Sequence, residues 1–151
     1  MPIVADVVWP GLFLGVKLVG LTVILVGLLV EFCALWLVLK FPWPKAILAD
    51  VVMNLVSVVP GAVLLGIASV GWEIFPGIAM YQWLGVGTFN PVTWSATFVM
   101  AVLINASLES ATLRFVFKYP FSRKVLVTLL VANSVSVAVA GVGLYLKPLD
   151  L

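Results

Sequence analysis

Four long apolar stretches constrain this chain more than any other feature of its sequence. They run over residues 11–39, 46–69, 93–117 and 125–146. Each reaches or exceeds the roughly 20 residues that an α-helix needs to cross about 30 Å of hydrocarbon. None alternates apolar and polar residues with a period of two, as the strands of a membrane barrel do. We therefore expect an all-α integral membrane protein with four transmembrane helices.

The balance of residue types agrees with this expectation. Hydrophobic residues make up 64% of the chain and charged residues 9%, whereas a soluble domain carries about 25% charged residues. We treat residues 1–151 as a single membrane domain, in which one helical hairpin covers about 11–69 and a second covers about 93–147. Aromatic residues are frequent in the intervening segment, about 70–92. They predict a loop at the outer membrane interface, and a short in-plane helix is compatible with it.

The two expected hairpins carry the same series of residues. The first series is Glu31, Leu35, Val38, Lys40, Pro42, Lys45, Asn54 and Ser57, and the second is Glu109, Leu113, Val116, Lys118, Pro120, Lys124, Asn133 and Ser136. The offset is 78 residues as far as Pro42 and 79 residues from Lys45 onward. This recurrence predicts two tandem hairpins related by a pseudo-twofold axis along the membrane normal.

Basic residues determine the expected orientation in the membrane. Five of them lie at the two short turns: Lys40, Lys45, Lys118, Arg123 and Lys124. The loop between the hairpins carries one charge, that of Glu73. Because cytoplasmic loops are enriched in Lys and Arg, we expect both turns in the cytoplasm and both termini outside. The expected location is the bacterial inner membrane.

Each hairpin also places one Glu and one Asn at the same depth. Glu31 and Asn54 lie nine residues from the lysines of the first turn, and Glu109 and Asn133 repeat this spacing at the second. At 1.5 Å per residue, these groups are about 13 Å from their turns, near the middle of a bilayer. A carboxylate at that depth costs several kcal/mol unless it is protonated or paired, and an Asn amide can donate to it. We therefore predict two intramembrane Glu–Asn pairs.

Two interpretations of these pairs remain open. As protonated hydrogen-bonding groups, they would fix the register of each hairpin, because interhelical hydrogen bonds worth about 0.6 to 2 kcal/mol still specify geometry. Alternatively, the two Glu residues would form a proton or cation site. Duplication is compatible with both roles, and we favour the structural one. The supporting polar residues expected within about a turn are Ser57, Ser136, Asn105 and Ser110.

Asp50 and Arg114 form a separate prediction. Both lie about 6 to 8 Å inside the expected cytoplasmic boundary, and neither recurs in the other hairpin. Opposite charges at one depth predict a single ion pair that locks the two hairpins together. In the alternative interpretation, each side chain extends separately to the cytoplasmic interface.

Several classes of chemistry have no support in the sequence. The chain contains no His and one Cys, which excludes a metal site made of several His and Cys ligands. No phosphate-binding loop or nucleophile motif occurs. We expect no enzyme activity and no cofactor. The net charge of +2 comes mainly from the turns, so nucleic acid is not an expected partner.

Two functions follow as hypotheses. The first is a non-enzymatic accessory or assembly subunit of a larger membrane complex, whose partners are lipid and other membrane subunits or a second copy. It rests on the small share of sequence outside the membrane and on small residues along the helices. The alternative is a small dimeric transporter or channel that uses Glu31 and Glu109 for proton or cation coupling.

Overall fold

The computed structural model describes residues 14, 16–18 and 20–146, and this part of the chain contains helices and no strand. The elements are α2 (Leu21–Cys33), the π-helix η1 (Ala34–Val38), α3 (Trp43–Trp72), the π-helix η2 (Glu73–Gly77), α4 (Ile78–Leu84), α5 (Pro91–Phe115) and α6 (Arg123–Leu146). Four segments are long and apolar enough to cross a membrane: Leu21–Val38, Trp43–Leu84, Pro91–Phe115 and Arg123–Leu146. The predicted all-α class is confirmed for the described residues, which include four helical segments long and apolar enough to cross a membrane.

The first span differs from its prediction at one end. Within the apolar run 11–39 we expected the membrane-buried span at 18–39, but α2 begins at Leu21, and Gly20 precedes it in an extended conformation, with φ −66° and ψ 137°. The Gly20 amide donates to the carbonyl of Lys17 at 3.0 Å, which ends the short helical segment to which residues 16–18 belong. Residues 11–13, 15 and 19 of the predicted run lie outside the described part of the chain.

The predicted loop over 70–92 is largely helical. Helix α3 continues to Trp72 and is followed directly by η2 and α4. The helical path is broken once, within η2, at Phe75, whose φ is −166° and ψ is 124°. Pro76 explains the break, because proline lacks an amide hydrogen and disfavours helical angles in the residue before it. Trp83 is 89% exposed on α4.

The remaining connection, residues 85–90, is short and has clear ends. Gly85 follows α4 in the left-handed conformation, with φ 62°, which is the usual way to end a helix. Asn90 caps α5, because its side-chain oxygen accepts the amides of Val92 and Thr93 at 2.9 and 3.0 Å. Pro91 occupies the first turn of α5, where its missing amide hydrogen costs nothing.

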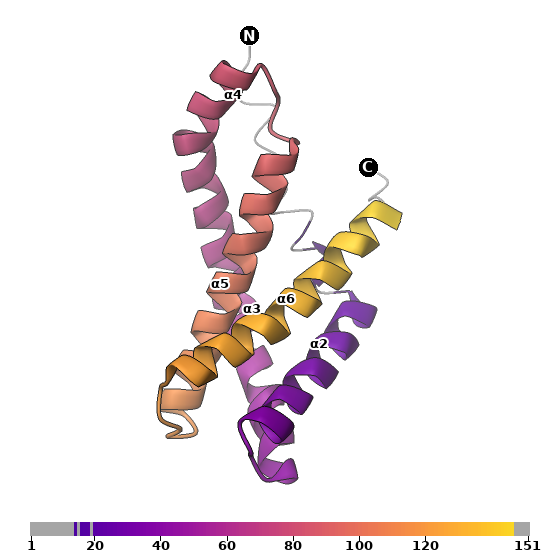
Figure 1. Cartoon of the computed structure of the whole chain (residues 1–151), viewed down its shortest axis with the longest axis vertical. Helices are drawn as coiled ribbons and strands as arrows, with labels where there is room; N and C mark the ends of the chain where they lie inside the picture. Colours follow the sequence, from indigo (N-terminus) through magenta and orange to yellow (C-terminus); the bar gives the residue numbers. More distant parts are fainter. Residues whose placement is uncertain (1–13, 15, 19, 147–151) are drawn as a thin grey trace.

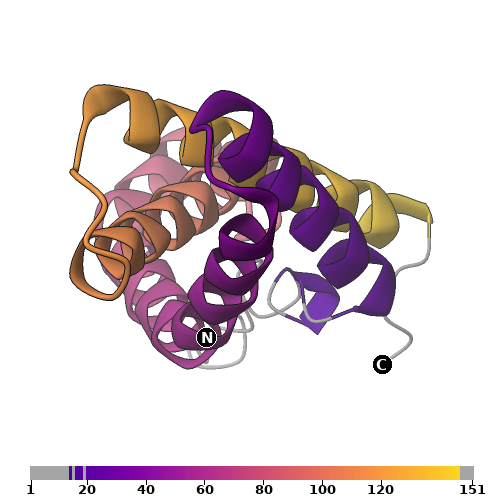
Figure 2. The same ribbon diagram turned by 90° about the horizontal axis from the view of Figure 1, so that it is seen from below.

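The long helices form two arms that meet near the turns and diverge toward the end that carries α4 (Figure 1). Helix α3 packs along α5 in one arm, and α2 packs along α6 in the other. Helices α5 and α6 are also in extensive contact, whereas α2 and α3 touch least among these four neighbouring pairs. The view from below shows the same separation of α2 from α3 (Figure 2). One of the four seams between helices is therefore loose.

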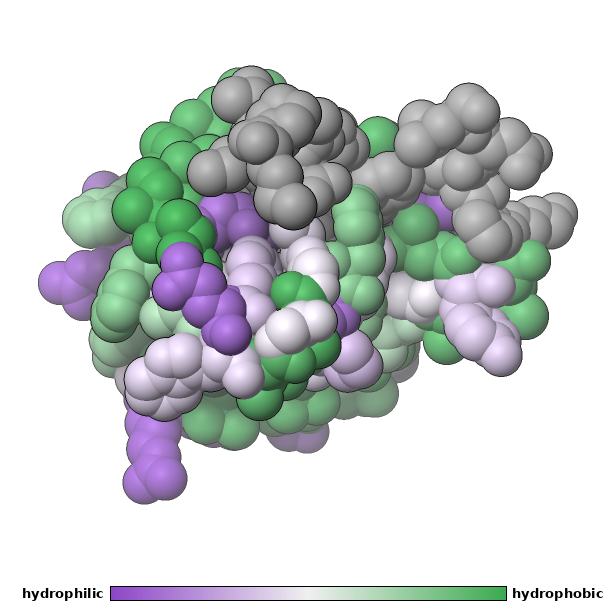
Figure 3. Space-filling view, turned by 90° about the horizontal axis from the view of Figure 1, so that it is seen from above, coloured by the Kyte–Doolittle hydropathy of each residue, from purple (hydrophilic) through white to green (hydrophobic). Residues whose placement is uncertain are grey.

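Apolar side chains cover most of the outside of the bundle. Leu55 and Val59 on α3 are 71% and 69% exposed, and Val131 on α6 is 61% exposed, although all three lie well inside their helices. Seen from the α4 end, hydrophobic residues follow much of the perimeter (Figure 3). Such a circumference suits lipid rather than water, because large exposed apolar surfaces are rare on soluble monomers.

Two apolar clusters fill the interior, one toward the turns and one toward the α4 end. The turn-side cluster consists of Leu35, Leu39, Phe41, Ala46, Ala49, Met53, Ala106, Leu113, Val125 and Leu129. The loop-side cluster consists of Leu14, Val23, Leu65, Ala101, Val137 and Ala140. Glu31, Asn54 and Asn133 lie between these clusters along their helices, whereas Glu109 lies between Ala106 and Leu113 of the turn-side cluster.

The two turns contact each other through an aromatic pair. The Phe41 and Tyr119 rings lie 4.7 Å apart between centroids, and the Tyr119 hydroxyl donates to the Leu39 carbonyl at 3.2 Å. The turns also share a backbone form, because Lys40 and Lys118 both adopt positive φ, at 61° and 55°. These contacts close the turn end of the bundle.

Candidate functional site

The first Glu–Asn pair joins α2 to α3. The Asn54 side-chain nitrogen donates to Glu31 Oε2 at 2.6 Å. The same nitrogen also lies 3.0 Å from the Asp50 backbone carbonyl and 3.2 Å from Asp50 Oδ1. Two carboxyl groups therefore share one amide donor. Glu31 and Asp50 are buried, at 2% and 4% exposure, while Asn54 is half-buried.

The second pair joins α5 to α6 with the same central bond. The Asn133 side-chain nitrogen donates to Glu109 Oε2 at 2.6 Å and to the Leu129 carbonyl at 3.1 Å. Glu109 is 1% exposed and Asn133 is 2% exposed. Among the described residues, no second carboxyl group shares the Asn133 amide, because Leu129 occupies the position that corresponds to Asp50 in the first half. The structure thus brings together both sets of partners expected from the sequence.

The predicted ion pair between Asp50 and Arg114 is wrong for this structure. Asp50 is buried and accepts from Asn54, whereas Arg114 is exposed and its guanidinium lies 6.0 Å from the centre of the Phe115 ring. Equal depth did not bring the two side chains together, because Asp50 faces the interior of the bundle and Arg114 faces outward. The burial of Asp50 also excludes the alternative in which it extends to the interface. The sequence did contain a signal for the contact between Asp50 and Asn54: they are four residues apart, and residues at that spacing share a helix face.

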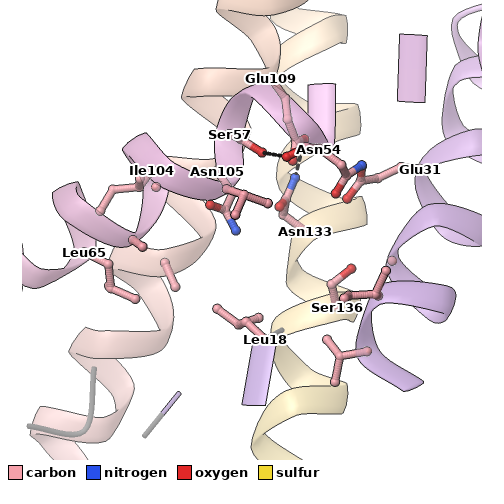
Figure 4. A pocket seen from close by; sticks show the side chains of 17 residues that line it. Leu18, Glu31, Asn54, Ser57, Leu65, Ile104, Asn105, Glu109, Asn133 and Ser136 are labelled. Atoms are coloured by element: carbon pink, nitrogen blue, oxygen red, sulfur yellow. Dashed lines mark hydrogen bonds between the residues drawn. The ribbon is translucent and has the colours of Figure 1, made fainter. Parts of the chain in front are cut away.

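Both pairs border one cavity of about 150 Å³. Its polar side is formed by Glu31, Asn54, Ser57, Asn105, Glu109, Asn133 and Ser136. Its other walls are small or apolar, and include Leu18, Val23, Leu65, Ala101 and Ile104. The close-up shows the polar side chains converging from all four long helices (Figure 4). A cavity of this volume has room for about five water molecules.

The supporting polar residues divide into three kinds. Ser57 and Ser136 line the cavity but donate to carbonyls of their own helices, at 3.2 and 3.5 Å. Asn105 also lines the cavity, and a Cβ added at Gly61 would lie 3.1 Å from its Oδ1, so a larger residue there would crowd the amide. Ser110 is buried without a hydrogen-bond partner and does not border the cavity in the part of the chain that is described.

The site contains acidic groups and no basic ones. Within the described residues, none of the three carboxyl groups of Glu31, Asp50 and Glu109 is within salt-bridge distance of a Lys or Arg. In the same part of the chain, no three His, Cys, Asp or Glu side chains are arranged to hold a metal ion. Three carboxyl groups at this depth need protons or cations, because each ionised group costs about 3 kcal/mol or more.

A second polar cluster at the α4 end was not predicted. The Tyr81 hydroxyl lies 2.9 Å from Glu73 Oε1 and 3.1 Å from Thr93 Oγ1. Trp72 Nε1 and Asn90 Nδ2 also donate to Thr93 Oγ1, at 3.4 and 2.9 Å. Periodicity carried no signal for this cluster, because the break at Phe75 is what lets Tyr81 reach Glu73. The cluster fastens α4 to the ends of α3 and α5.

Comparison with known proteins identifies no relative: no family model, no curated protein and no solved structure matches the chain. The functional argument therefore depends on the residues of the cavity.

Proposed function

We propose that this protein is a small membrane transport protein whose coupling site is the carboxyl pair Glu31 and Asp50. The observation that carries the proposal is the shared Asn54 amide, which holds the Asp50 and Glu31 carboxyl groups together, while Glu31 and Asn54 themselves border the cavity. Two carboxyl groups so close cannot both be ionised without a large energetic cost, so one proton or one monovalent cation must accompany them. Binding and release of that cation would be the coupled step.

Glu109 has a different role in this proposal. Its carboxyl group lies in the tight seam between α5 and α6, and its Asn partner, Asn133, is not shared with a second carboxyl group. We assign it to holding α5 and α6 in register as a protonated hydrogen-bonding group. The proposal therefore combines both interpretations of the Glu–Asn pairs and gives one to each half of the molecule.

Two finer features belong to the same proposal. The recurring residues, the matching Glu–Asn bonds and the two lysines of positive φ support tandem hairpins related by a pseudo-twofold axis. The basic residues at the turns support a cytoplasmic location for both turns. Single cysteines at Pro44 and Ser122, in a chain that lacks Cys33, should then react only from the cytoplasm, and one at Gly77 only from outside. The opposite labelling pattern would reverse the orientation.

Flux measurements on purified protein in liposomes test the transport function. We expect proton or monovalent-cation flux that is lost in Glu31→Gln and in Asp50→Asn, since Gln and Asn keep hydrogen bonds but cannot ionise. Glu109→Gln is the matched control and should retain at least half of the flux. Flux that is absent from the wild type, or equal in all four proteins, would contradict the proposal.

A second candidate function, a subunit of a larger membrane assembly, is favoured by the outer face of α6. Ser134 and Ala138 lie one turn apart there, are exposed, and border two shallow grooves together with apolar residues of α5 and α6. Small side chains on a lipid-facing surface allow another helix to approach closely. Native mass measurement after mild extraction from the source membrane tests this candidate, and a monomer free of other chains would contradict it.

A further inference from the structure

Among the described residues, apolar side chains border the cavity toward both ends of the bundle, and the walls on one further side are more exposed. Its turn side is packed by Leu35, Met53, Leu113 and Leu129 of the turn-side cluster, beyond which the Phe41 and Tyr119 rings meet. Its other end is bordered by Val23, Leu65 and Ala101 of the loop-side cluster. A hydrated ion would have to pass one of these apolar layers to reach the carboxyl groups.

The loose side lies between α2 and α3. Among the cavity-lining residues, Ile24 of α2 and Val58 of α3 are 41% and 55% exposed, and Ala62 of α3 is also exposed. The lining residues of α5 and α6 are buried or half-buried. Because α2 and α3 have the least contact of the four neighbouring pairs, the described residues leave the mouth of the cavity between these two helices, on a side of the bundle that would meet lipid. A ligand entering there must first dissolve in the bilayer.

From this arrangement we infer that the cavity takes a small lipophilic amine from the lipid, through the mouth between α2 and α3. This inference rests on the proposed carboxyl site and names its substrate class. An amine crosses hydrocarbon in its neutral form, whereas an ammonium ion with no partner is excluded from it. In the cavity, the protonated carboxyl of Glu31 transfers its proton to the amine nitrogen. A neutral acid and a neutral base thus become a carboxylate and an ammonium held together, with no change in total charge.

The lining residues match the two parts of such a molecule. Glu31 borders the cavity, and its carboxylate has lone pairs beyond the one that accepts from Asn54, so it can also accept from an ammonium. The Asn105 side chain, which borders the same cavity, offers a further acceptor. Charge-assisted bonds of this kind are the strongest hydrogen bonds in proteins. The apolar walls formed by Val23, Leu65 and Ile104 suit a hydrocarbon group, and a cavity of about this volume accommodates a benzene ring.

Calorimetric titration of the protein in lipid nanodiscs with benzylamine tests the inference. We expect one benzylamine per chain and no binding of benzyl alcohol, which has the same shape but cannot accept a proton to become a cation. Glu31→Gln should weaken benzylamine binding at least tenfold. Ala62→Phe and Ile24→Phe, from opposite sides of the mouth, should each weaken or slow it. Val63→Phe is the matched control, because Val63 is 57% exposed on the same helix but does not border the cavity.

The outcomes separate this inference from the proposed function. If wild-type protein does not bind benzylamine, or if Glu31→Gln binds it unchanged, the amine cavity is refuted. If benzyl alcohol binds as well as benzylamine, the pairing of an ammonium with Glu31 is refuted. If both mouth variants bind benzylamine as well and as fast as the Val63→Phe control, the route through the lipid-facing mouth is refuted. Glu31-dependent ion flux without benzylamine binding would overturn the inference alone, whereas loss of both would overturn the proposed function as well.

Discussion

The two Glu–Asn pairs have the same central bond in different surroundings. In each pair an Asn side chain donates to a Glu Oε2 at 2.6 Å between two neighbouring helices. Around Glu31 the seam is loose, the Asn is half-buried and Asp50 supplies a second carboxyl group. Around Glu109 the seam is tight and Leu129 stands in the place of that carboxyl group. The same Glu–Asn bond thus lies in a tight seam in one half of the protein and beside a second carboxyl group in the other. The proposed coupling site depends on this difference.

The largest effect is expected when the second pair is given the acidic neighbour of the first. Leu129→Asp would put a carboxyl group at a position that is 0% exposed in the turn-side cluster and would remove a packed leucine. We expect a loss of about 3 kcal/mol in the free energy of unfolding, measured by detergent-induced unfolding in mixed micelles. A loss below about 1 kcal/mol would show that the second seam is no tighter than the first.

An intermediate effect should distinguish the two Glu residues themselves. Glu109→Leu leaves the enclosed Asn133 amide with the Leu129 carbonyl as its remaining acceptor among the described residues, and should cost about 1 to 3 kcal/mol. Glu31→Leu should cost less, because Asn54 keeps both the carbonyl and the Oδ1 of Asp50 as acceptors. The same unfolding measurement on both variants decides between them. Equal losses of unfolding free energy in the two variants would contradict the proposed difference between the enclosed Glu109–Asn133 pair and the Glu31–Asn54 pair, whose Asn has other acceptors.

The smallest effect on stability is expected at Asp50. Asp50→Leu gives the first half the residue found at the matching position of the second. Replacement of a buried polar group by an apolar one of similar size is often neutral or stabilising, so the unfolding free energy should change by less than about 1 kcal/mol. Flux should nevertheless be lost, because only one carboxyl group remains on Asn54. Retained flux in a stable Asp50→Leu protein would exclude Asp50 from the site.

Much of the fold was predictable from length and spacing. Four apolar runs defined the spans, and the nine-residue spacing from the turns placed Glu31 level with Asn54, and Glu109 level with Asn133, across their hairpins. The start of the first span was not predictable from hydropathy, since Gly20 breaks the helix within apolar sequence. A short helix within residues 70–92 was allowed for, but the position of α4 was not predictable, because it depends on the break at Phe75.

The candidate site was only partly predictable for a physical reason. Depth follows from residue number along a helix, but the direction of a side chain depends on which helices become neighbours. Asp50 was therefore placed at the correct depth and assigned the wrong partner, Arg114. The looser packing of α2 against α3 was also not predictable, because the two hairpins carry the same recurring series of residues and nothing in that series says which pair of helices packs less tightly.

The account depends most on which carboxyl groups exchange protons, and infrared difference spectroscopy measures this directly. Spectra recorded across a pH titration in nanodiscs should contain a carboxylic-acid carbonyl band that appears and disappears with pH. We predict that this band is absent from Glu31→Gln and altered in Asp50→Asn, and that Glu109→Gln leaves it unchanged. A titrating band that survives in Glu31→Gln and is removed by Glu109→Gln would contradict the assignment of the coupling site to the first pair.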